Sequence, residues 1–148
     1  MQKPSSDDHL RARTSSQIAG LEMALKHYRI DNGEYPVTVS GSMPSPVNQG
    51  DPATYADSAR LLFSSLSGRA NFGTAPVSGI KSYYPFKRNQ ISGLSSTVAA
   101  DAWGNAIGYN SRKPHHNPGS FDLWSTGGGK LIAEKSRWIA NFGLPDEN

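Results

Sequence analysis

Histidine, serine and aspartate residues in the C-terminal part of the chain are the side chains best suited to catalysis or metal binding. His115 and His116 are adjacent, so on a strand they would point to different sides, and Asp122 is the nearest third ligand. Ser120 or Ser125 can be combined on paper with a histidine and Asp122 into a triad. Neither serine lies in the Gly-x-Ser-x-Gly sequence that exposes such a nucleophile. We therefore predict no enzyme and no catalytic residue, and we place the histidines at a solvated hairpin tip.

Two tyrosines with basic neighbours form a second candidate site. Tyr83 and Tyr84 lie between Lys81 and the pair Lys87 and Arg88. This combination is able to stack on and hold a glycan or a single nucleic-acid strand. An edge strand with amphipathic aromatic side chains explains the same residues more simply. A secreted ligand-binding domain that uses this edge remains the alternative from a different functional class.

Composition and local sequence exclude several other kinds of site. The 148 residues carry a net charge of +3 without a block of Lys or Arg, so we expect no nucleic-acid partner. There is no cysteine, which excludes disulfides, thiolate metal sites and a cysteine nucleophile. Residues 127–129 are all glycine, but no Lys-Ser or Lys-Thr pair follows as it does in a phosphate-binding loop. No run of about 18 apolar residues occurs, so the chain as given is predicted to be soluble.

A long helix is predicted within residues 1–33, with its pattern beginning at Asp7. One face carries residues that step by three or four along the chain: Leu10, Thr14, Ile18, Leu21, Leu25 and Tyr28. Asn32 and Gly33 can supply the left-handed residue that ends a helix, and Pro36 prevents its continuation.

The predicted helix has two unlike halves. Its inward face is apolar from Ile18 to Tyr28 and polar from Arg11 to Gln17. Because only the apolar half can gain from burial in a core, we expect the C-terminal half to lie on the domain. The N-terminal half is expected to stand clear of it.

The middle of the chain, residues 37–79, is predicted to be a loop followed by a second helix. Asp51 and Pro52 have the residue types that begin a helix, and Gly68 the type that ends one. Its apolar face consists of Tyr55, Ala59, Leu62, Phe63 and Leu66. This short helix is expected to pack beside the first.

The last part of the chain, residues 80–148, is predicted to form a small antiparallel sheet and a tail. Strands are expected at 80–86, from 107 to 111 and at 121–126, and the tail at 130–142 is either a short helix or a return strand. A turn precedes the second strand, in which Asp101 bonds backbone two residues on, Trp103 pins the turn to the core, and Gly104 and Asn105 permit the reversal. The three tryptophans, Trp103, Trp124 and Trp138, are predicted to be core anchors. The chain is therefore predicted to be one domain, 1–148, of α+β class, in which a long N-terminal helix packs on a small antiparallel sheet with one short extra helix.

Three segments together resemble one family. Residues 25–36, LKHYRIDNGEYP, resemble the helix-end signature of type II secretion major pseudopilins, protein G of the general secretion pathway. Residues 101–109, DAWGNAIGY, resemble that family's Asp-Pro-Trp-Gly-Asn-Pro motif, and residues 121–127, FDLWSTG, its Phe-Asp-Leu-Tyr-Ser-Leu-Gly strand. Residues 139–142, IANF, are a looser match to the closing Ile-Gly-Asn-Trp. The order and coarse spacing of these motifs agree.

The resemblance implies a type IV pilin-like fold and a structural role in a secretion filament. Family members carry an apolar N-terminal segment that anchors them in the inner membrane, and we expect that this segment has been removed here. The implied location of the full-length protein is the periplasmic side of the bacterial inner membrane. The implied partners are further copies of itself, minor pseudopilins and the inner-membrane platform, with membrane contact only through the missing segment. A pilin-like subunit of another type IV filament system, used for adhesion or uptake, is the closest alternative.

The resemblance also implies a calcium site, but this chain departs from the family's pattern of calcium ligands. The family often binds calcium after the Ser-Leu-Gly strand, where this chain has Gly129 and Trp138 in place of two aspartates. Calcium takes six to eight oxygen ligands, several of them carboxylates. The weak candidates that remain are Asp122, Thr126 and Glu134. We therefore predict no metal and no cofactor, with the loop carbonyls bonded instead by Lys130 or Arg137.

Assembly contacts are expected on the exposed side of the long helix. The candidate residues are charged and lie mostly off the inward face: Arg11, Arg13, Glu22, Lys26 and Arg29. Subunits that meet head to tail without closing a ring generate a helical filament.

Overall fold

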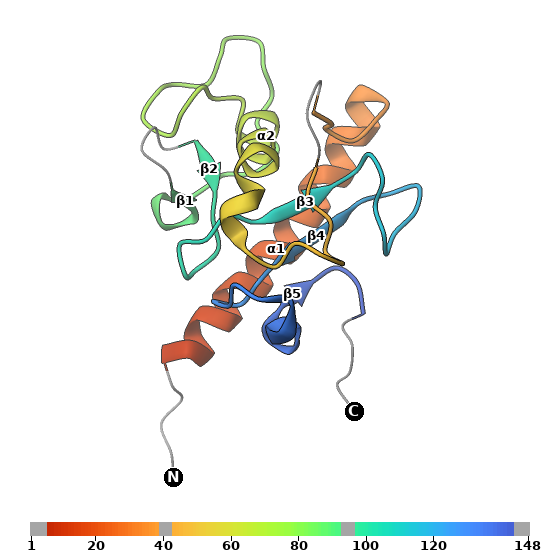
Figure 1. Ribbon diagram of the computed structural model, residues 1–148. Coiled ribbons are helices and arrows are strands. Elements are labelled where there is room, and N and C mark those ends of the chain that lie inside the picture. Colours follow the sequence, from red (N-terminus) through yellow and green to blue (C-terminus); the bar gives the residue numbers. More distant parts are fainter. Residues whose placement is uncertain (1–5, 39–42, 93–96, 144–148) are drawn as a thin grey trace.

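The computed structural model describes residues 6–38, 43–92 and 97–143, which form an α+β domain (Figure 1). Its helices are α1 (Ser6–Asn32), α2 (Ala56–Ser67) and the 3₁₀ helices η1 (Pro52–Tyr55), η2 (Arg88–Gln90) and η3 (Ile132–Arg137). Its strands are β1 (Ile91–Ser92), β2 (Val98–Ala99), β3 (Gly108–Asn110), β4 (Asp122–Ser125) and β5 (Ile139–Ala140). The predicted class and the long N-terminal helix are confirmed.

Helix α1 spans 27 residues, about 40 Å, and runs diagonally across the molecule (Figure 1). It ends as predicted, because Gly33 has a φ of +86° and donates its backbone N–H to the carbonyl of Arg29 at 2.8 Å. The Asn32 side chain donates to the Tyr28 carbonyl at 2.9 Å. Pro36 follows, and its carbonyl accepts the hydroxyl of Tyr109, which fastens the end of the helix to β3.

Two small antiparallel sheets form the rest of the framework. One has the strand order β3-β4-β5, and the other pairs β1 with β2. The tail therefore contains both elements that the sequence allowed, the 3₁₀ helix η3 and the return strand β5.

Strand β4 has a hydrophobic cluster on each of its faces. As its alternation predicts, Leu123 and the preceding Phe121 belong to the main core, while Trp124 belongs to a second cluster with Tyr55 and Trp138. The indoles of Trp124 and Trp138 stack with centroids 6.1 Å apart and planes at 10°, and Trp124 Nε1 donates to the Tyr55 hydroxyl at 3.0 Å. Both faces of the sheet are therefore covered.

The main core joins α1 and α2 to the sheet. Its buried apolar residues come from α1 (Ile18, Leu21, Ala24, Leu25), from α2 (Leu62, Phe63, Leu66) and from the strands and nearby loops (Met43, Ala99, Ile107, Tyr109, Phe121, Leu123). As predicted, Asp51 accepts the N–H of Ala53 at the start of η1, and Gly68 ends α2 with a φ of +71°. Helix α2 shares this core with α1 but packs mainly on β2 and β3.

The strand predicted at residues 80–86 is wrong. The N–H groups of Tyr83 and Tyr84 both donate to the carbonyl of Leu66, at 2.7 and 2.9 Å, so they satisfy the C-terminal end of α2 instead of a strand ladder. Pro85 has no N–H to offer a neighbouring strand. The segment therefore crosses the end of α2 as an irregular loop.

Within the part of the chain that the structure describes, no helix has both the length and the apolar character needed to cross a membrane.

Gly108 gives the first testable prediction. A Cβ at this position would lie 2.2 Å from the Trp124 ring, so Gly108→Ala forces the indole out of its stack. We expect the free energy of unfolding to fall by about 2–3 kcal/mol in urea denaturation, the cost of overpacking a core. Gly143→Ala is the matched control, because no atom lies within 4 Å of a Cβ there. Equal stability of the two variants would contradict the packing described for β3.

Candidate functional site

The N-terminal half of α1 does not stand clear of the domain, contrary to the prediction. Thr14 and Gln17 are both buried. Ala102 donates its N–H to Thr14 Oγ1 at 3.1 Å, and Gln17 Nε2 donates to the carbonyl of Ala100 at 2.8 Å. Hydrogen bonds to the segment before β3 hold this half of the helix where an apolar stripe is lacking. The hydrophobic pattern of the sequence does not predict docking that depends on polar side chains.

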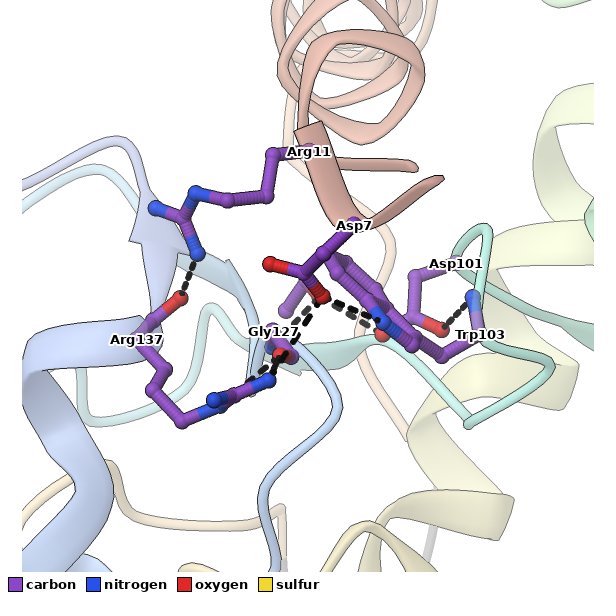
Figure 2. A network of polar contacts seen from close by, with 7 residues as sticks. Asp7, Arg11, Asp101, Trp103, Gly127 and Arg137 are labelled. Carbon is purple, nitrogen blue, oxygen red and sulfur yellow. Dashed lines mark hydrogen bonds and ion pairs between the residues drawn. The ribbon is translucent and has the colours of Figure 1, made fainter. Parts of the chain in front are cut away.

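A group of polar contacts, which we call the clasp, extends this docking to the first turn of the helix (Figure 2). It consists of Asp7, Arg11, Trp103, Gly127 and Arg137. Asp7 accepts the indole N–H of Trp103 at 3.2 Å and lies 3.6 Å from the Arg137 guanidinium. Arg11 donates to the backbone carbonyl of Arg137 at 2.6 Å. The clasp therefore joins the start of α1 to two loops that are distant in the sequence.

The side chain of Arg137 also reaches the loop after β4. Its Nε and Nη2 atoms donate to the carbonyl of Gly127 at 3.2 and 3.0 Å. This approach requires glycine, because Gly127 has a φ of +63° and a Cβ would lie 2.0 Å from the Arg137 carbonyl oxygen. The predicted contact between Arg137 and a loop carbonyl is confirmed. That it replaces an ion remains a prediction.

The buried carboxylate of Asp101 organises the turn that carries Trp103. Its Oδ1 accepts the N–H groups of Trp103 and Asn105, each at 3.0 Å, and its Oδ2 accepts the hydroxyl of Ser125 at 2.6 Å. Gly104 has a φ of +82°, as the predicted reversal requires. Burial raises the pKa of Asp101, and these three hydrogen bonds partly oppose that effect. The predicted turn is confirmed, with an additional bond to β4.

Trp103 is not a core anchor, contrary to the prediction. Its ring is half-buried and lies on the backbone of Gly128, where a Cβ would be 3.0 Å from the indole. Trp124 and Trp138 are fully buried, as predicted. Trp103 differs because its indole N–H is used by Asp7 at the surface.

The two carboxylates named as weak calcium candidates are both bonded to backbone N–H groups. The Glu134 carboxylate accepts the N–H groups of Lys130 and Leu131, and the Asp122 carboxylate accepts those of His115, His116 and Asn117. The Thr126 hydroxyl is buried without a hydrogen-bond partner in the described chain. One hydroxyl supplies only one of the six to eight oxygen ligands that calcium takes. The described residues contain no group of three or more His, Asp or Glu suited to a metal.

The histidines and serines of the first candidate site are engaged separately. His115 and His116 are exposed in the β3–β4 loop, and the His116 ring stacks on Phe142 with centroids 3.9 Å apart. Ser125 bonds Asp101, whereas Asp122 is used by backbone N–H groups. The structure therefore does not bring a serine, a histidine and Asp122 together as a triad.

The two tyrosines of the second candidate site face different neighbours. The Tyr83 hydroxyl and Lys81 Nζ donate to the Asp31 carboxylate, at 2.8 and 2.9 Å. These two bonds lower the pKa of Asp31, and the bond from Lys81 has the larger effect. The Tyr84 ring lies against Gly20 of α1. One continuous binding edge made from both tyrosines is therefore not formed.

The candidate assembly residues differ in their exposure to solvent. Arg13, Lys26 and Arg29 are exposed, and Glu22 is half-buried, 3.9 Å from Lys26. Arg11 is half-buried and donates to the carbonyl of Arg137, so it is the most constrained of the candidates, and its role in assembly stays a prediction.

Sequence reasoning missed the apolar part of the outer helix face. Met23 is 56% exposed and Ile30 is 77% exposed. They belong to an outward row with steps of four and three, which we call the outer seam, and whose members are all exposed: Ala12, Ser16, Ala19, Met23, Lys26 and Ile30. This spacing is that of helices that pack along their length. The seven-residue interval between Met23 and Ile30 was the available signal.

Comparison with protein-family models, with curated proteins and with solved structures finds no match to this chain. The function must therefore be argued from the clasp and the outer seam. These two features occupy different sides of α1, one directed to the domain and one to solvent.

Asp101 provides a test of how the turn is held. Asp101→Ala leaves buried N–H donors without an acceptor, so we expect the free energy of unfolding to fall by about 2–4 kcal/mol. Asp101→Asn keeps an acceptor for both N–H groups and should lose less than half as much. Because burial raises the pKa of Asp101 above its ordinary value, the wild type loses stability relative to the Asn variant as the pH rises from that ordinary value through the raised one. Denaturation of the three proteins at several pH values measures this, and equal losses for Ala and Asn would contradict it.

Arg137 and calcium are tested together. Arg137→Met removes the donors to Gly127 while keeping a long stem, and we expect a loss of about 1–2 kcal/mol in unfolding free energy. The half-exposed ion pair with Asp7 adds little to this. Calorimetry should give no stoichiometric calcium binding to the wild type, and a chelator should leave its melting temperature unchanged. Lys130→Met is the control. Tight calcium binding to the wild type would refute the prediction.

Proposed function

We propose that this chain is a structural subunit, the periplasmic domain of a pseudopilin of a type II secretion system. In this role it builds a filament that helps to move folded proteins across the outer membrane. The observation that carries the proposal is the outer seam, a row of exposed residues that are small or apolar except for Lys26, along a helix whose other side is docked on the domain. The order of the three sequence motifs supports it independently.

The seam suits a second helix better than a small ligand. Ala12, Ser16 and Ala19 occupy its N-terminal part and would let another backbone approach closely, whereas Met23 and Ile30 would supply apolar area beyond them. Met23 and Ile30 are the large apolar members of the seam, and they lie on the same side of the helix with Lys26 between them. Charged neighbours such as Arg13 and Arg29 would set the register between copies.

The clasp supports a mechanical role. A helix that transmits position along a filament must keep a fixed angle to its own domain. Asp7 and Arg11 hold the first turns, Thr14 and Gln17 the next, and the apolar core the remainder. Fastening along the whole length would make α1 and the sheet move as one body.

The partners under this proposal are other copies of the chain, minor pseudopilins and the inner-membrane platform. No cofactor and no catalytic step is part of it. The full-length protein would be held at the periplasmic side of the inner membrane by an apolar segment upstream of this domain. The native upstream sequence tests this directly, because a leader without such a segment would remove the basis for a filament.

The outer seam gives a functional test in the full-length protein. Met23→Glu and Ile30→Glu each place a charge in the seam, and we expect loss of filament assembly and of secretion because a desolvated carboxylate is costly. The purified domain should keep its unfolding free energy, since both side chains are solvent-exposed. Val77→Glu is the matched control, because Val77 is 55% exposed and lies in the loop after α2, outside the seam. Normal assembly by both seam variants would overturn the proposal.

A further inference from the structure

A polar hollow lies between the N-terminal half of α1 and the segment that carries Tyr84 and Gln90. Its volume is about 560 Å³, within the range of small-molecule sites. Its helix wall includes Ala12 and Ser16 of the outer seam and the assembly candidate Arg13, whereas Met23 and Ile30 do not line it. Its facing wall includes Tyr84 and Lys87, which belong to the second candidate site of the sequence.

The charge of the hollow is entirely positive. Arg13 enters from the helix and Lys87 from the facing segment, and the described residues that line it include no aspartate or glutamate. Both side chains are exposed, and within the described chain neither has an ion-pair partner. Two unneutralised cations on opposite walls favour a ligand that carries a carboxylate, which a guanidinium binds in a bidentate manner.

The remaining polar groups suit hydroxyls more than a second carboxylate. Gln17 uses its Nε2 on the carbonyl of Ala100, which leaves its Oε1 as an acceptor at the wall of the hollow. Asn89 adds an amide with both a donor and an acceptor, and Ser16 adds a hydroxyl. An ionised carboxylate cannot donate a hydrogen bond to these acceptors, whereas sugar hydroxyls both donate and accept.

The walls of the hollow are held in place before any ligand arrives. The Tyr84 ring lies against Gly20, where a Cβ would be 2.9 Å from it, and its hydroxyl accepts from Gln90 Nε2 at 3.1 Å. Gln90 Oε1 in turn accepts the backbone N–H of Lys87 at 2.8 Å. These bonds fix Tyr84, Gln90 and the backbone at Lys87, whereas the exposed Arg13 and Lys87 side chains would be ordered on binding.

We propose that this hollow binds a hexuronic acid residue of an acidic polysaccharide. The carboxylate lies between Arg13 and Lys87, and the ring hydroxyls bond Gln17 and Asn89. A nucleic-acid strand is a poorer fit, since two cations do not form the basic row that follows a phosphate backbone. The hollow shares Ala12, Arg13 and Ser16 with the proposed assembly face, so a bound ligand and a neighbouring subunit would compete for this surface.

The test is calorimetric titration of the chain with tetragalacturonate. We expect saturable binding that weakens as salt is raised, and an approximately tenfold loss of affinity in Arg13→Gln and in Lys87→Gln, the loss of one charge-assisted bond. Lys130→Gln, which changes the net charge equally at an exposed residue outside the hollow, should bind as the wild type does. Unchanged melting temperatures will show that the variants are folded.

Two further ligands distinguish the parts of the proposal. Fully methyl-esterified tetragalacturonate keeps the sugar and removes the charge, and it should not bind measurably. Citrate keeps the charge without the sugar ring, and it should bind at least tenfold more weakly than tetragalacturonate. Equal binding of citrate, binding of the ester, no binding of tetragalacturonate, or equal affinity in Arg13→Gln and Lys130→Gln would each overturn the assignment.

Discussion

The need to satisfy one buried carboxylate shapes the contact between the two ends of this domain. Asp101 is out of reach of solvent, so each of its oxygens must find donors within the chain. It takes them from its own turn and from Ser125 on β4. The turn thereby presents Trp103 to Asp7 and, beside it, the backbone groups that receive Thr14 and Gln17. The docking of the polar half of α1 thus follows from the folding of a five-residue turn.

The elements that the sequence predicted well are those whose signal is local. The end of α1 depends on neighbouring residues, Asn32, Gly33 and Pro36, and the turn depends on the residue types at 101–105. The alternation of Phe121, Leu123 and Trp124 likewise assigned each to its face of the sheet, because side chains in a strand alternate whatever lies opposite. In these places the short-range preference and the final structure agree.

The errors occurred where a distant group changed the outcome. Residues 80–86 have the composition of a strand, but the carbonyl of Leu66 takes the N–H groups that a strand would have paired. The helix from Arg11 to Gln17 lacks apolar residues, and nothing local shows that Ala100 and Ala102 lie ready to bond it. Arg137 was named as a partner for the loop carbonyls, but its neighbours Asp7 and Arg11 were not. Side chains that act across more than a hundred residues leave no periodic trace in the sequence.

The stacked indoles of Trp124 and Trp138 have a consequence for observing this molecule. One ring belongs to the central strand and the other follows η3, so their near-parallel arrangement exists only while the C-terminal segment is closed over the sheet. Parallel aromatic rings at this spacing couple their electronic transitions, which gives circular dichroism in the near ultraviolet. The near-ultraviolet circular dichroism of the domain therefore reports whether the C-terminal segment is closed over the sheet, without an attached label.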